Sequence, residues 1–94
     1  MYIVVHHHVA DPVRFMQIAA GEGSLPPGVT MHSFLPTRDP GTVFCLWEAE
    51  AVAAVRNLLD SAFGDTSRNE YFEVEPAHAF GFPVTTGATA GAAS

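Results

Sequence analysis

Three consecutive histidines, His6-His7-His8, are the residues of this chain whose type and spacing are most suited to chemistry. They belong to an apolar, β-branched stretch, residues 2–9, which favours a β-strand over a flexible expression tag. Because successive side chains of a strand point to opposite faces, His6 and His8 share one face and His7 takes the other. Two imidazoles at this spacing can reach one metal ion or one substrate. The pattern therefore predicts a site without specifying a reaction.

The composition is that of one small globular domain. The chain has 94 residues, of which 48% are hydrophobic, and a formal net charge of −6. Its four positive side chains are all arginines and form no basic cluster, which argues against nucleic acid as a partner. We expect no membrane partner, because no apolar run approaches the ~18–20 residues that span a bilayer. No secretion signal is recognisable, so we expect a cytoplasmic protein, and the single cysteine, Cys45, also suits that compartment.

The pattern of apolar residues and turn formers predicts four strands and two helices. We expect the strands at residues 2–9, 29–35, 42–49 and 70–77, and the helices at 13–20 and 50–63. The order βαββαβ is typical of the ferredoxin-like α+β fold, in which a four-stranded antiparallel sheet carries both helices on one face. We assign residues 1–82 to this domain and 83–94 to a flexible C-terminal tail. Two such sheets often pair through their open faces, so we expect a homodimer that forms a dimeric α+β barrel.

The alternation of side chains along each strand predicts which residues lie on the open face of the sheet. We place the more apolar set of each strand against the helices. A turn centred between Arg38 and Asp39 then sets His32 opposite Cys45, on one face with Phe34. The predicted open face collects His6, His8, His32, Cys45, Trp47, Tyr71, Glu73 and Glu75. Because the first strand lies between the third and the fourth in this topology, these side chains can converge.

The histidines of this face predict a metal site. Neutral imidazoles together with a carboxylate or a thiolate suit nickel, zinc, copper or iron. The expected ligands are His6, His8, His32, Glu73 and Cys45. Their spacing matches no established metal signature such as C-x-x-C or H-E-x-x-H. The alternative for any one of these histidines is a polar residue that backbone or water satisfies.

A second interpretation is an enzyme of the dimeric α+β barrel type. His32 or His6 would act as general acid or base. The apolar wall of the substrate pocket would consist of Phe34, Trp47 and Tyr71. Such an enzyme would be a cofactor-free monooxygenase, cyclase or isomerase that acts on a small aromatic or polyketide-like molecule.

Cys45 opposite His32 could also form a thiolate–imidazole pair, although a lone cysteine is more often a small buried residue. A third interpretation is an oligomerisation module with no site.

The central hairpin resembles a known family. His32-Ser33-Phe34, then a polar turn, then Val43-Phe44-Cys45-Leu46-Trp47-Glu48-Ala49, is similar to a hairpin in a family of small ferredoxin-like proteins of formerly unknown function. That family includes a nickel-responsive, nickel-binding member. The resemblance covers residues 30–75 and carries over His32, Ser33, Phe34 and Cys45, whereas the first strand has three histidines where the family has charged residues. The resemblance implies nickel as the ion, so our leading expectation is a non-catalytic, nickel-binding homodimer.

Overall fold

The chain folds as strands and helices in the order that the sequence predicts. The computed structural model describes residues 1–21 and 25–82, so the predicted tail, 83–94, lies outside the described residues. Within these ranges the elements are β1 (Tyr2–Val9), α1 (Pro12–Ala20), β2 (Thr30–Pro36), β3 (Thr42–Glu48), α2 (Val52–Phe63) and β4 (Ser67–Glu73), with short 3₁₀ turns at Gly64–Thr66 and Pro76–His78. None of the described helices is long and apolar enough to cross a membrane.

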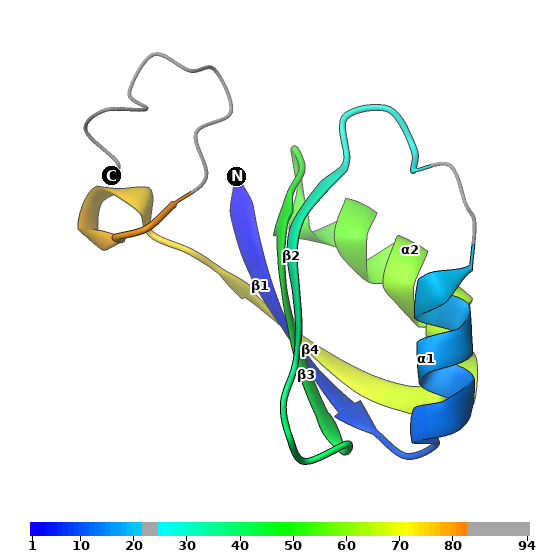
Figure 1. The fold of residues 1–94 in the computed structure, drawn as a ribbon. Coiled ribbons are helices and arrows are strands. Elements are labelled where there is room, and N and C mark those ends of the chain that lie inside the picture. Colours follow the sequence, from blue (N-terminus) through cyan, green and yellow to red (C-terminus); the bar gives the residue numbers. More distant parts are fainter. Residues whose placement is uncertain (22–24, 83–94) are drawn as a thin grey trace.

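The strands form one antiparallel sheet in the order β2-β3-β1-β4. Figure 1 shows α1 and α2 on the same side of this twisted sheet, whose other face no described helix covers. This arrangement confirms the ferredoxin-like α+β fold. The histidine strand, β1, is an inner strand that pairs with β3 on one side and with β4 on the other. Its backbone is therefore held on both sides, which fixes the direction of each histidine.

Local sequence signals set the ends of the helices. The side chain of Asp11 caps α1 by accepting a hydrogen bond from the backbone N–H of Arg14 at 3.1 Å, and Pro12 takes the first helical position. α2 ends at Phe63 and is followed by Gly64, whose φ of +54° lies in a region that residues with a Cβ rarely adopt. Both signals are visible in the sequence, so the predicted helix bounds agree with the structure to within two residues.

The last strand, β4, begins at Ser67, three residues earlier than predicted. The backbone carbonyl of Thr66 accepts hydrogen bonds from the N–H groups of Ala10 and Asp11, at 2.8 and 3.2 Å. These bonds tie the start of β4 to the end of β1. Long-range pairing therefore recruits a polar stretch, residues 67–69, into the sheet, although its composition is typical of a turn.

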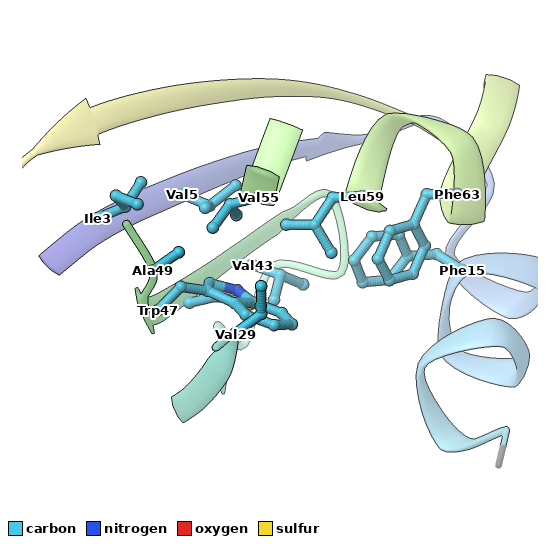
Figure 2. Packing of buried hydrophobic residues seen from close by; sticks show 11 residues of the cluster. Ile3, Val5, Phe15, Val29, Val43, Trp47, Ala49, Val55, Leu59 and Phe63 are labelled. Carbon is cyan, nitrogen blue, oxygen red and sulfur yellow. The ribbon is translucent and has the colours of Figure 1, made fainter. Parts of the chain in front are cut away.

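The core lies between the sheet and the two helices. Phe15 of α1 stacks on Phe63 of α2, with ring centroids 4.2 Å apart and an interplanar angle of 16°. Figure 2 shows this pair at one end of the cluster and Trp47 among strand residues closer to the other end. The other buried apolar residues of the cluster are Ile3, Val5, Val29, Val43, Cys45, Ala49, Val55 and Leu59. The aromatic stack therefore joins the helices above a layer of mostly aliphatic strand residues.

The faces of β3 are the reverse of the prediction. Cys45 and Trp47 point to the helices and are 3% and 4% exposed, whereas Phe44 and Leu46 lie on the open face. Cys45 pairs with Val5 of β1, and cross-strand partners share a face. The prediction that Cys45 and Trp47 lie on the open face was therefore wrong. Both sets of side chains on this strand are apolar, so hydrophobicity alone does not select the buried set.

β2 contains an irregularity that the predicted hairpin lacks. The register with β3 shifts between Met31 and Ser33, which leaves His32 as the extra residue of a β-bulge. Beyond the bulge, Phe34 and not His32 lies opposite Cys45. Phe34 therefore shares the helix face with Cys45, and its predicted place on the open face was wrong.

The side chains of β4 also lie on the faces opposite to those predicted. Tyr71 lies opposite Val5, so Tyr71 and Glu73 share the helix face, and their predicted place on the open face was wrong. The open face of β4 instead carries Glu70 and Phe72. β4 is the edge strand beside α2, where a helix-facing polar side chain can bond to the polar surface of that helix, as the Tyr71 hydroxyl does. Polar residues are therefore tolerated on the face that hydrophobicity would assign to the open side.

Replacing Phe15 with alanine should lower the free energy of unfolding by about 3–5 kcal/mol, because the change removes a fully buried ring from the core. Urea unfolding followed by circular dichroism measures the difference. Val13→Ala is the matched control: Val13 lies on the same helix but is 68% exposed, so its loss should stay below about 0.5 kcal/mol. Equal small losses in the two variants would contradict the place of Phe15 in the core.

Candidate functional site

His6 and His8 lie side by side on the open face of the sheet, as the alternation along β1 predicts. Their ring centroids are 3.9 Å apart, with an interplanar angle of 35°. The ring of Phe44 stacks on His6 at 4.6 Å and restrains it. The side chains of His6 and His8 are 26% and 35% exposed. Both imidazoles are therefore accessible from solvent while the sheet and its side chains hold them in place.

Glu70 of β4 joins the two histidines. Its Oε1 atom lies 2.5 Å from Nε2 of His8 and 3.7 Å from Nδ1 of His6. Each of the three residues offers one ligand atom, and these atoms all lie within 4.8 Å of one another. Imidazole nitrogens with a carboxylate are common ligands of zinc and other transition metals. This set, the His6/His8/Glu70 group, could therefore hold a metal ion.

The charge of Glu70 suits this role. The hydrogen bond from His8 lowers the pKa of the Glu70 carboxyl below its usual value, and the charges of His8, Arg68 and His6 act in the same direction. Desolvation opposes this shift but is outweighed. The carboxylate is therefore ionised at neutral pH. A cation bound here would replace the proton that His8 donates to it.

Apolar side chains continue from the group along the same face. Val4 of β1 lies between Leu46 of β3 and Phe72 of β4. Phe44 is 37% exposed and Phe72 is 51% exposed. We call Val4, Phe44, Leu46 and Phe72 the apolar strip. The His6/His8/Glu70 group lies at one end of this strip.

His32 is on the open face but apart from the group. Its Nε2 atom lies 3.0 Å from Oε1 of Glu48, and its ring centroid lies 5.6 Å from that of Tyr2 at the beginning of β1. Tyr2 and His6 are four residues apart on the strand, which corresponds to about 13 Å. The structure therefore does not bring His32 together with His6 and His8.

Cys45 contacts a histidine other than the predicted one. On the helix face its Sγ atom lies 3.3 Å from Nε2 of His7, which is fully buried. Nδ1 of His7 lies 2.6 Å from Oδ1 of Asn69. Because an amide oxygen only accepts, Nδ1 carries the ring proton and Nε2 accepts the thiol hydrogen. Cys45 is on the opposite face of the sheet from His6 and His8, so the structure does not add it to their group.

Asn69 is oriented in turn by α2. Its Nδ2 donates to Oδ1 of Asp60 at 3.0 Å, and the hydroxyl of Tyr71 donates to the same oxygen at 2.5 Å. The hydrogen bond from Tyr71 is the largest of the effects that lower the pKa of Asp60. We call the linked residues Cys45, His7, Asn69, Asp60 and Tyr71 the polar chain. Tyr71 thus belongs to a hydrogen-bonded network and does not line the pocket described below.

Burial keeps the Cys45–His7 pair uncharged. Desolvation lowers the pKa of His7 more strongly than the hydrogen bond of Asn69 raises it. Burial also raises the pKa of the Cys45 thiol to about 12, although the Trp47 indole favours the thiolate. The pair therefore consists of a thiol and a neutral imidazole at pH 7. It is not a thiolate–imidazole pair, and His32, the partner predicted for Cys45, lies on the other face.

Phe34 and Trp47 line a pocket of about 500 Å³ between the sheet and the helices. His7 and Cys45 reach the pocket from the sheet. The helices contribute Ile18, Ala19, Leu58, Leu59, Ala62 and Phe63. Two of the three predicted wall residues therefore share a pocket, but it opens on the face opposite to the His6/His8/Glu70 group.

The carboxylate beside the histidines is Glu70 and not Glu73. Glu73 lies opposite Ile3, near the other end of β1, and Glu75 lies beyond the last residue of β4. The prediction missed Glu70 because it assigned the wrong face of β4 to the open side. Charge pairing could have indicated Glu70. It lies opposite His6, and an acidic side chain opposite a basic one stabilises an antiparallel pair of strands.

The burial of His7 predicts a loss of stability in mild acid. The folded state lowers the pKa of His7, so below the ordinary histidine value of about 6.5 the unfolded chain binds a proton that the folded chain does not. The free energy of unfolding should therefore fall as the pH drops below about 6.5, by up to about 1.4 kcal/mol per pH unit. Urea titrations at a series of pH values measure this slope.

The variant His7→Gln separates this effect from other acid titrations. It should flatten the slope between about pH 6.5 and pH 5, because a neutral amide replaces the titrating ring. His78→Gln removes an exposed histidine and should keep the wild-type slope. The lowered pKa of Asp60 acts in the more acidic range of carboxyl groups, below this window. An unchanged slope in His7→Gln would refute the prediction.

Comparisons with known proteins assign no family to the chain. No family model, no curated protein and no solved structure matches it. The structure by itself supports a ferredoxin-like topology and a His6/His8/Glu70 group that could hold a metal ion. The membership in the nickel-binding family, the homodimer and the cytoplasmic location stay predictions.

Proposed function

We propose that this protein binds a divalent transition-metal ion through His6, His8 and Glu70. The observation that carries the proposal is the convergence of three ligand atoms within 4.8 Å on two paired strands. The hydrogen bonds between β1 and β4 fix the spacing of these side chains. A metal ion would therefore meet ligands that are already close together, and binding would need little ordering of the protein.

Nickel is the ion that we propose first. Nickel, zinc and copper all accept imidazole nitrogens with a carboxylate oxygen, and the resemblance of the hairpin to a nickel-binding family favours nickel among them. The net charge of −6 also favours a cation over an anion. Three protein ligands leave coordination positions for water or for a further ligand. The proposed function is metal binding itself, and the donor set specifies no reaction.

Isothermal titration of tag-free, chelator-treated protein with nickel or zinc should show binding of one ion per chain. Glu70→Gln and His6→Ala should each weaken the affinity by at least about tenfold, because each removes one of three ligands. Lowering the pH from about 7.5 to about 5.5 should weaken binding as well, because a protonated imidazole cannot bind a metal.

Two matched variants test the placement of the site. Glu73→Gln changes a carboxylate of the same strand on the other face, and His32→Ala removes the histidine that lies apart from the group. Both should bind the ion with wild-type affinity. Absence of any binding in the wild type, or unchanged binding in Glu70→Gln together with loss in His32→Ala, would contradict the proposal.

We further propose that a second copy of the chain packs on the apolar strip. Grouped, exposed aromatic side chains such as Phe44 and Phe72 are unusual on a surface that faces only water. Paired sheet faces would bury them and would place the His6/His8/Glu70 group near the boundary between the copies. This is the homodimer that the fold class predicts.

Sedimentation equilibrium should show a dimer for the wild type. Phe72→Glu should shift the population to monomer, because a carboxylate would be buried without a partner in the interface. Val13→Glu introduces the same charge at an exposed position on α1 and should leave the dimer intact. A wild-type protein that stays monomeric at about 100 μM, a concentration at which dimers with micromolar Kd are formed, would contradict the proposal.

A further inference from the structure

An open hollow of about 430 Å³ lies beside the His6/His8/Glu70 group, at one end of the sheet. His8 lines this hollow and also belongs to the group. The other lining residues include Arg68 of β4 and Gly41 of the turn between β2 and β3. Figure 1 shows this turn and the end of β1 at the same end of the sheet. A molecule in the hollow would therefore lie next to a metal ion that the group holds.

Arg68 brings a permanent positive charge to this place. It pairs with His8 across the two strands, and cross-strand partners share a face of the sheet. It is two residues from Glu70 and near enough for its charge to act on that carboxylate. Its side chain is exposed, and within residues 1–21 and 25–82 no hydrogen bond or ion pair holds its guanidinium. Arginine stays charged at every pH at which neutral imidazoles bind a metal.

This charge opposes the proposed metal ion. A divalent cation in the His6/His8/Glu70 group and the guanidinium of Arg68 would repel each other. The single negative charge of Glu70 leaves two of the three positive charges uncompensated. The three protein ligands also leave coordination positions open on the ion. An anion between the ion and the guanidinium would remove the repulsion and occupy an open position.

Asp65, which also lines the hollow, does not supply this negative charge. Its side chain is 90% exposed, and its Oδ1 atom lies 3.5 Å from an amino group of Arg14. Water and the charge of Arg14 therefore screen the carboxylate. Among the described residues of the hollow, the compensation of Arg68 is left to a bound molecule.

The two positive partners define the class of this molecule. The planar guanidinium of an arginine binds a carboxylate through two parallel hydrogen bonds. Carboxylate oxygens are also ligands of nickel and zinc. A molecule with two carboxylates on a short chain can serve both partners at once, and its two negative charges match the two positive charges that Glu70 leaves uncompensated.

We propose that the hollow binds a small dicarboxylate, with one carboxylate on the metal ion and the other on the guanidinium of Arg68. The inference rests on the proposed metal binding and names its second ligand. Metal ion and dicarboxylate then bind cooperatively, and each raises the affinity of the other by the same factor.

Succinate and butyrate are the probes, because they share a four-carbon chain and differ in the second carboxylate. Calorimetry measures the Kd of nickel or zinc, whichever the chelator-treated wild type binds more tightly, at constant ionic strength. About 10 mM succinate should lower this Kd about fivefold, whereas the same concentration of butyrate should change it less than about twofold. Succinate also binds the free ion in solution. That competition raises the apparent Kd, so it cannot produce the expected result.

The variant Arg68→Gln tests the two effects of the arginine. Without succinate it should bind the metal about twofold more tightly than the wild type, because the repelling charge is gone. With succinate it should gain no more affinity than with butyrate. Arg56→Gln is the matched control, since it removes the same charge from α2, where the guanidinium lies 5.5 Å from the ring centre of Tyr71. It should respond to succinate as the wild type does.

Four results would overturn the inference. Equal effects of succinate and butyrate on a wild type that binds the metal would overturn it alone and leave the proposed function intact. So would a succinate effect that persists in Arg68→Gln, because the second carboxylate would then have another partner. Weaker metal binding by Arg68→Gln without succinate would refute the repulsion. Absence of nickel and zinc binding in the wild type would overturn the inference together with the proposed function.

Discussion

The two faces of this molecule depend on the pairing of β1 with strands on both of its edges. An inner strand cannot rotate or shift without breaking hydrogen bonds to β3 and to β4, so the three histidines are assigned to faces by the backbone. His6 and His8 reach the open face, where Glu70 of β4 lies opposite His6. His7 enters the core, where it contacts Cys45. One short segment thus supplies side chains to two chemically different surroundings that are separated by the thickness of the sheet.

The buried imidazole is compatible with the core because the polar chain satisfies it. Both ring nitrogens of His7 have partners, and Asn69 is itself held by Asp60 at the surface of α2. A buried polar group with all its partners costs little, whereas the loss of one partner leaves an unsatisfied group in a region of low dielectric. The polar chain also connects the sheet to α2, in addition to the apolar contacts of Val55 and Leu59. It therefore contributes to the position of the helix that forms one wall of the pocket.

The arrangement of the elements could be predicted from the sequence, but the distribution of side chains between the faces could be predicted only in part. β1 has the predicted bounds, and the order βαββαβ follows from turn formers and apolar periodicity. Assigning the more apolar of the two alternating sets, Ile3, Val5, His7 and Val9, to the helices also predicted the correct faces of β1. β3 is apolar on both faces, so its buried set depends on the register with β1, which is a long-range property. The bulge at His32 and the early start of β4 likewise result from pairing between distant segments, and the error on β4 moved the expected carboxylate from Glu70 to Glu73.

The polar partners of His7 also determine which alignment of β1 the chain can adopt during folding. A slip of β1 by one residue would bring His6 and His8 into the core, a clear mismatch. A slip by two residues is harder to discriminate, because Ile3, Val5, His7 and Val9 would still face inward. In either direction of that slip the imidazole would lose its place opposite Asn69, the residue that accepts the hydrogen of its Nδ1 atom. The histidine that takes no part in the proposed metal group thus widens the energy gap between the native pairing and its nearest competitor.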